Sequence, residues 1–147
     1  MKELSYFTDI VYGLEKILYY ERGKGSYFRA SLIGTDFIKP KKIEGDTVEE
    51  VVDKCVKELI EGEIITDATY LKDEDGVLFT FKIKGCIHLP VEARLKESGV
   101  PPYVCSPINM ILYKVAETLH VAVESVDINV DENKGECVVR VVVFEAD

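Results

Sequence analysis

Three cysteines and one histidine are the side chains of this sequence that could bind a metal ion. Cys86 and His88 follow a strand-like run, Cys105 precedes a predicted helix, and Cys137 opens the last predicted strand. Zinc prefers four nitrogen or sulfur ligands in a tetrahedron, and these residues supply both donor types. Their spacing contains no Cys-x-x-Cys pair, so the alternative of small buried core residues also fits them. Cys55 lies in the apolar stripe of a predicted helix and is assigned to the core.

A cysteine nucleophile is a second chemical interpretation of the same residues. Cys105 lies just before a helix N-terminus, a position that lowers the pKa of a thiol, and Cys86 is the other candidate. Such catalysis also needs a base in contact with the sulfur. His88 and His120 are the two histidines of the chain, and His120 closes a predicted helix far along the sequence. The sequence therefore favours a metal or core role for the cysteines over catalysis.

Aromatic side chains make an apolar ligand pocket a third interpretation. The chain has 8 Tyr and 6 Phe but no Trp. A mostly apolar cavity with a few polar anchors is typical of small-molecule sites, and an ordinary aromatic core is the alternative for each residue. The candidate pocket residues lie in the N-terminal helical region or on the long loop after the first hairpin, and they are Tyr12, Tyr19, Tyr27, Phe28, His88 and Tyr103.

The charge of the chain argues against a nucleic-acid or anionic-membrane surface. The net charge is −9 and the isoelectric point is about 4.8, whereas such surfaces need clustered positive charge. The stretch from Arg22 to Lys42 is a local exception, in which Asp36 is the single acid. This stretch is either an anion site or a solvated face. No glycine-rich phosphate loop occurs in its proper context, so no nucleotide cofactor is expected.

Length and composition indicate one ordered domain over residues 1–147. The chain is 47% hydrophobic and 31% charged, and it contains no run of about 18 apolar residues. The N-terminal segment lacks a signal-peptide pattern, so a cytoplasmic location with reduced cysteines is expected. The absence of Gln and Trp, with many Glu and Lys, is typical of a thermophilic source.

Apolar residues that recur at three- and four-residue steps predict the helices. In the first helix, one stripe is predicted to contain Phe7, Ile10, Val11, Leu14, Ile17 and Leu18. Thr47 and Glu50 match a capping box at the start of the clearest helix, and Ser106 is a good N-cap for the last one. The predicted helices cover residues 5–21, 26–34, 48–61, 90–98 and 107–119.

Period-two alternation predicts two β-hairpins with short turns. The first has strands at 63–71 and 77–84, and the second has strands at 123–130 and 136–144. Strands joined in this way pair antiparallel. The amphipathic helices need one face of the sheet to bury their stripes. The predicted fold class is therefore α+β, with an antiparallel four-stranded sheet of two hairpins packed against amphipathic helices in the order ααα-ββ-α-ββ.

The order of these elements resembles the 4-vinyl reductase domain family, a family of hydrocarbon-binding domains that shares its fold with the Bet-family subunits of TRAPP vesicle-tethering complexes. The resemblance covers nearly the whole chain. It also rests on the pair Gly85–Cys86 after the first hairpin, on Cys105 in PPYVCSP and on Cys137 in NKGEC. It implies a small ligand that is hydrophobic or aromatic.

Phenol-sensing members of that family hold a zinc ion at one end of the domain. The resemblance implies Cys105 and Cys137 as the outer ligands and places Asp127 near the carboxylate position. The family pattern has another cysteine that this chain lacks, because the sequence between Asp127 and Cys137 reads INVDENKGE. Together, residue types and resemblance suggest Cys86, Cys105, Asp127 and Cys137 as the metal set, with His88 as the alternative to Asp127.

We therefore expect a stand-alone cytoplasmic domain that binds a small hydrophobic or aromatic molecule as a sensor or carrier, with zinc as its implied cofactor. Relatives of this fold dimerise through helices, so a homodimer is expected, with Leu4, Tyr12 and Tyr19 of the first helix as flanking apolar residues. One alternative is a metal-dependent or reductase-associated enzyme acting on a vinyl-bearing ring. The other is a protein-interaction subunit, which an internal ligand cavity would distinguish from the binding domain.

Overall fold

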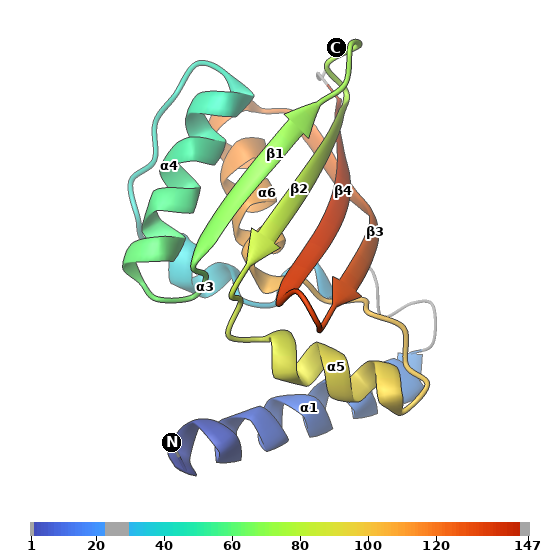
Figure 1. The fold of residues 1–147 in the computed structure, drawn as a ribbon. Coiled ribbons are helices and arrows are strands. Elements are labelled where there is room, and N and C mark those ends of the chain that lie inside the picture. Colours follow the sequence, from blue (N-terminus) through green and yellow to red (C-terminus); the bar gives the residue numbers. More distant parts are fainter. Residues whose placement is uncertain (1, 23–29, 145–147) are drawn as a thin grey trace.

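Two β-hairpins form one antiparallel sheet with the strand order β1-β2-β4-β3 (Figure 1). The strands are β1 (Asp67–Lys72), β2 (Leu78–Lys84), β3 (Ala122–Asp131) and β4 (Glu136–Phe144). The hairpins join along the β2–β4 ladder, where Phe81 lies opposite Val139. The computed structural model describes residues 2–22 and 30–144, and over these residues it confirms the predicted α+β fold with a four-stranded sheet of two hairpins.

Helices α4 (Val48–Glu61) and α6 (Ser106–Leu119) cover one face of the sheet (Figure 1). The main core lies between this face and the two helices. Phe79 and Phe81 of β2 are its largest fully buried side chains, and Cys55 of α4 is also fully buried, as predicted. The alternating burial along β2 and β4 follows from the side-chain period of two in a strand.

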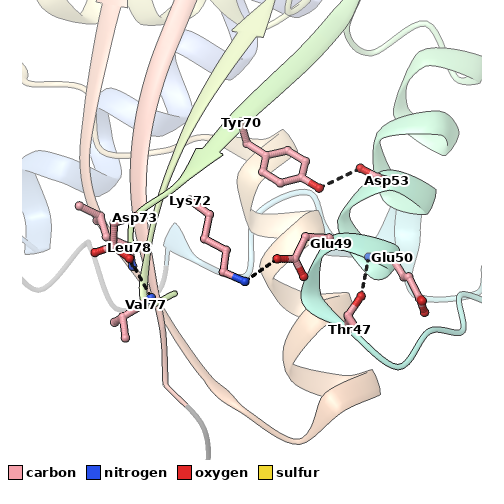
Figure 2. Close-up of polar contacts among 9 residues, drawn as sticks. All are labelled: Thr47, Glu49, Glu50, Asp53, Tyr70, Lys72, Asp73, Val77 and Leu78. Carbon is pink, nitrogen blue, oxygen red and sulfur yellow. Dashed lines mark hydrogen bonds and ion pairs between the residues drawn. The ribbon is translucent and has the colours of Figure 1, made fainter. Parts of the chain in front are cut away.

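The start of α4 has the predicted capping box in a modified form (Figure 2). The backbone N–H of Glu50 donates to the Thr47 hydroxyl over 3.2 Å, while the Glu50 carboxylate accepts from the backbone N–H of Asp46 at 2.8 Å. These bonds satisfy N–H groups that have no partner within the helix. Two further contacts in Figure 2 join β1 to α4, from Lys72 to Glu49 at 2.7 Å and from Tyr70 to Asp53 at 3.1 Å.

Helices α1 (Lys2–Arg22) and α5 (Leu89–Glu97) lie side by side beyond the end of β2, away from α4 and α6 (Figure 1). A second apolar cluster fills their contact. Its buried members include Val91 and Leu95 of α5, and Val11 and Leu18 of α1 pack against them. The first helix therefore packs one side against α5, whereas α4 and α6 pack against the sheet.

Several element boundaries differ from the sequence prediction. β1 begins at Asp67, because residues 63–66 form a connection in which Glu63 has a φ of 59°. The predicted helix over 26–34 lies partly outside the described residues; its described part ends in a turn, followed by the one-turn helix α3 (Thr35–Ile38). Ser106 is the first residue of α6 rather than its cap, a position that Cys105 takes.

Candidate functional site

The structure brings Cys86, Cys105 and Cys137 to one small cavity, together with His88 and Glu92. Cys86 follows β2, Cys105 caps α6, and Cys137 lies on β4 opposite Ile83 of β2. The β2–β4 register therefore brings Cys137 next to the chain that leaves β2. The cavity has a volume of about 10 Å³, which is room for one water molecule at most.

Burial keeps the three thiols protonated. It raises the pKa of Cys86 to about 11 and that of Cys137 to about 12, and it raises the pKa of Cys105 well above its ordinary value. Burial also lowers the pKa of His88, which leaves the imidazole neutral. Because the thiolate and not the thiol is the nucleophile, this environment does not activate any of the three cysteines. The geometry gives no support to a cysteine nucleophile.

The predicted metal set does not come together as a whole. Asp127 lies on β3 and does not line the cysteine cavity; Arg140 donates to both of its carboxylate oxygens, at 3.0 and 2.9 Å. This ion pair lowers the pKa of Asp127. The structure therefore does not bring Asp127 together with the three cysteines. Among the described residues no three Cys, His, Asp or Glu side chains are arranged to hold a metal ion, so the residues present do not fit zinc as they stand. Zinc binding stays a prediction of the resemblance.

The residues predicted to line a ligand pocket are divided among three places. The Tyr12 hydroxyl is 2.6 Å from the Ser98 hydroxyl at the outer edge of the α1–α5 contact. Tyr19 and Tyr103 lie within that contact, with ring centroids 5.6 Å apart. His88 lines the cysteine cavity. Tyr27 and Phe28 lie outside the described residues. The described members of the set thus do not share one cavity.

Two glutamates that the sequence interpretation did not single out are buried in the α1–α5 region. Glu15 of α1 is 6% exposed and Glu92 of α5 is 4% exposed. One carboxylate oxygen of each, Oε2, has no hydrogen-bond partner among the described residues, and Glu92 also lines the cysteine cavity. Burial raises the pKa of Glu15 to about 7, and burial together with the nearby Glu15 raises that of Glu92 to about 8.

An apolar surface runs along the side of α1 that faces away from α5. Phe7, Ile10, Leu14 and Ile17 recur at helical spacing, and their exposed fractions lie between 42% and 63%. We call these four residues the α1 stripe. Leu4, Tyr6 and Tyr20 extend it and are also exposed. Scattered apolar side chains are common on protein surfaces, but a continuous row of large ones marks an interaction surface.

A surface pocket of about 400 Å³ adjoins the α1 stripe. Its described lining comes from α1 alone. Tyr12, Gly13, Ile17 and Tyr20 supply the mostly apolar wall, and Lys16 and Glu21 add charged groups. Small-molecule sites have volumes of this order, but they enclose more of the ligand than one helix can. The pocket is open to solvent and is separate from the cysteine cavity.

The described part of the basic stretch is compensated by acids. Each of its lysines forms an ion pair with a neighbouring carboxylate, Lys39 with Asp36, Lys41 with Glu58 and Lys42 with Glu44, at 3.3 to 3.5 Å. These lysines are therefore not arranged as an uncompensated anion site. Of the two interpretations of this stretch, the geometry of residues 39–42 favours the solvated face.

No described helix is both long and apolar enough to cross a membrane.

Comparison with protein-family models, with curated proteins and with solved structures finds no match to this chain. The resemblance to the 4-vinyl reductase domain family thus rests on the element order and the three cysteine motifs alone and stays a prediction.

Proposed function

We propose that this chain is an interaction domain that assembles as a homodimer through the α1 stripe. The observation that carries the proposal is the exposure of Phe7, Ile10, Leu14 and Ile17 on a helix whose opposite side already packs against α5. Covering the exposed half of such a side chain stabilises an assembly by about 1 kcal/mol. In a symmetric pair each side chain contributes twice, because the same surface is used by both copies.

The glycine of α1 leaves room for a second helix beside the α1 stripe. Gly13 directly precedes Leu14 of the stripe, and a Cβ atom at Gly13 would meet no described atom within 4 Å. A residue without a side chain allows the backbones of two helices to approach closely. The charged neighbours of the stripe are used within the chain, because Asp9 pairs with Arg94 of α5 and Lys16 lies over the Tyr12 ring.

Light scattering at micromolar concentration tests the proposal. The wild-type chain is expected to be a dimer, and Leu14→Glu to be a folded monomer with a dissociation constant at least about 100-fold higher, because two charges would be buried in an apolar contact. Leu71→Glu is the matched control, since Leu71 of β1 is 77% exposed but lies away from α1, and this variant should stay dimeric. A wild-type monomer, or a Leu14→Glu dimer of unchanged affinity, would refute the homodimer.

A second candidate function is the binding of a small aromatic molecule in the pocket beside Tyr12 and Tyr20. The volume and the mostly apolar wall of this pocket favour it. The same surface would make the domain a carrier or sensor, in line with the resemblance. Because Ile17 and Tyr20 belong to both the pocket and the exposed side of α1, a bound molecule and a second copy would compete.

Filling the pocket tests this second function. Gly13→Leu places a side chain in open space, so the fold should be retained while the affinity for phenol, used as the probe, falls at least about tenfold. Isothermal titration of wild type and variant measures the change. Ser5→Leu adds the same side chain to an exposed position of α1 outside the pocket and should bind phenol like wild type. Equal phenol binding by the Gly13→Leu variant would exclude this pocket.

A further inference from the structure

The surface pocket on α1 has the residue spacing of a hole that receives one side chain of a neighbouring helix. In paired helices such a hole is bounded by four residues, which on one face of a helix are spaced i, i+3, i+4 and i+7. The pocket is lined by four residues with this spacing, Gly13, Lys16, Ile17 and Tyr20. Because Gly13 has no side chain, and an added Cβ would meet no described atom within 4 Å, the hole has room for a large side chain.

Tyr6 is a large exposed side chain in the same row of α1 as this hole. Tyr6, Gly13 and Tyr20 are seven residues apart, so they lie in one row along the helix, two turns from one another. Tyr6 is 62% exposed, and its ring packs edge-on against the neighbouring Phe7, with 5.8 Å between the ring centroids. Within one chain Tyr6 cannot fill the hole, because the centre of the hole lies about 16 Å further along the same helix.

A second copy of α1 can bring Tyr6 to the hole. Helix α1 forms the outer layer of the α1–α5 pair, so its exposed side is accessible to another molecule (Figure 1). In an antiparallel pair, a two-fold axis places each row of one helix against the same row of the other. Full overlap of two α1 helices, from residue 2 to residue 22, puts Tyr6 at the level of residue 18, within the span of the hole. The same overlap places Ile10 opposite Leu14, so the α1 stripe of one copy meets the α1 stripe of the other.

The chemistry of the pocket suits a tyrosine ring. Its wall is mostly apolar, and Lys16 and Glu21 add charged groups to it. A tyrosine has an apolar ring that gains from burial and a hydroxyl that needs a polar partner. An ammonium group can donate to this hydroxyl, and a carboxylate can accept from it.

We propose that in the homodimer the Tyr6 ring of each copy fills the α1 pocket of the other, between Gly13 and Tyr20. The inference rests on the proposed homodimer and adds its antiparallel register and its central contact. Each dimer then contains two identical contacts of this kind. A phenol molecule in the pocket would take the place of the Tyr6 ring, which gives the competition between small molecule and second copy a structural cause.

A double-mutant cycle in the full chain tests the contact, with dimer dissociation constants measured by sedimentation equilibrium. Tyr6→Ala empties the hole and should weaken the dimer at least about 100-fold, because each dimer loses two buried rings. Tyr6→Phe keeps the ring and should stay within about tenfold of wild type. Gly13→Leu fills the hole and should weaken the dimer at least about tenfold. In the Tyr6→Ala/Gly13→Leu variant the leucine occupies the space that the ring leaves. This dimer should therefore be at least about tenfold tighter than the two single losses multiplied together predict.

Phe7→Ala is the matched control for Tyr6→Ala. Phe7 is as exposed as its neighbour, at 61%, but it lies outside the row that contains Gly13. The effects of Phe7→Ala and Gly13→Leu on the dissociation constant should therefore multiply without coupling. All of these changes lie at exposed positions or in open space, and circular dichroism of each variant confirms that the fold is retained.

The outcomes separate this inference from the proposed dimer. If wild type is a dimer but positions 6 and 13 show no coupling, the inference is overturned and the homodimer stands with another register. A Tyr6→Ala dimer of wild-type affinity has the same meaning. If wild type is a monomer, the homodimer is refuted and this contact with it.

Discussion

Replacing Gly85 with alanine is expected to lower the free energy of unfolding by about 3 kcal/mol. Gly85 has a φ of 64°, in the left-handed region that costs other residues about 1–2 kcal/mol. An added Cβ would also lie 2.0 Å from the hydroxyl oxygen and 2.7 Å from the Cβ of Thr66. These atoms cannot move apart without shifting the chain before β1, and overpacking of this kind costs about 1–3 kcal/mol.

Two other glycines provide matched controls for Gly85. Gly99 and Gly135 also have positive φ values, 83° and 65°, but an added Cβ would meet no atom within 4 Å at either position. Alanine at either position should lower the free energy of unfolding only by the cost of the left-handed backbone, about 1 kcal/mol each. Urea unfolding of the three variants separates steric from backbone cost. In a Thr66→Ala background, Gly85→Ala should recover part of its loss, and full additivity of the two changes would contradict the steric explanation.

The position of Gly85 also explains why the cysteines meet. The backbone N–H of Gly85 donates to the Gly135 carbonyl over 3.1 Å, which ties the exit of β2 to the turn before β4. Cys86 follows this bond and Cys137 lies just beyond the turn, so both reach the same cavity. A distorted Gly85 should therefore disturb the cysteine cavity before it disturbs the outer strands.

The sheet was predicted well because each local sequence pattern was compatible with only one strand or turn structure. The strand over 136–144 was predicted with its observed bounds, since period-two alternation and a glycine-containing turn leave little freedom of register. Thr47 and Glu50 likewise located the start of α4, because both groups act within one turn. The start of β1 was predicted four residues too early. Residues 63–66 include strand-forming types, but the backbone of Glu63 is left-handed, with a φ of 59°, and β1 begins only at Asp67.

The placement of α1 could not be read from its periodicity. Helical spacing shows that Phe7, Ile10 and Leu14 share a side of the helix, but not whether that side faces the sheet, another helix or solvent. A second, narrower apolar side, with Val11 and Leu18, faces α5 and was counted in the same stripe. The two sides differ in the structure because a long helix that lies beyond the sheet end can bury only the side that meets α5.

The candidate site was predictable in its cysteines and not in its carboxylates. Cys86, Cys105 and Cys137 were chosen by residue type; the β2–β4 register brings Cys137 next to Cys86, and the start of α6 adds Cys105. Glu15 and Glu92 look in sequence like ordinary glutamates of amphipathic helices. Their burial depends on how α1 meets α5, which is a long-range contact. An internal glutamate next to Leu14 and Leu18 was the one local signal that could have indicated Glu15.

Replacing Asn109 with leucine should destabilise the fold by about 3 kcal/mol. Asn109 of α6 is 8% exposed, and its side-chain amide donates to the carbonyls of Ala30 and Ile33, at 2.7 and 3.0 Å. Leucine has a similar volume but no donor, so two carbonyl acceptors would lose their partner at a cost of about 1–3 kcal/mol each. The melting temperature should fall by about 6–12 °C for a chain of this length.

The same amide fixes where the chain re-enters the body of the domain after α1. Ala30 belongs to the cluster between α1 and α5, while Asn109 belongs to the helix that covers the sheet, so these two bonds join the second cluster to the main core. Beyond the loss of stability, Asn109→Leu should therefore lower the hydrogen-exchange protection of α1 more than that of α4. Asn129→Leu changes the same residue type at an exposed position of β3 and should alter the free energy of unfolding by less than about 0.5 kcal/mol. If Asn109→Leu lowers the hydrogen-exchange protection of α1 and α4 equally, Asn109 stabilises the main core alone. The position of α1 would then depend only on its contact with α5.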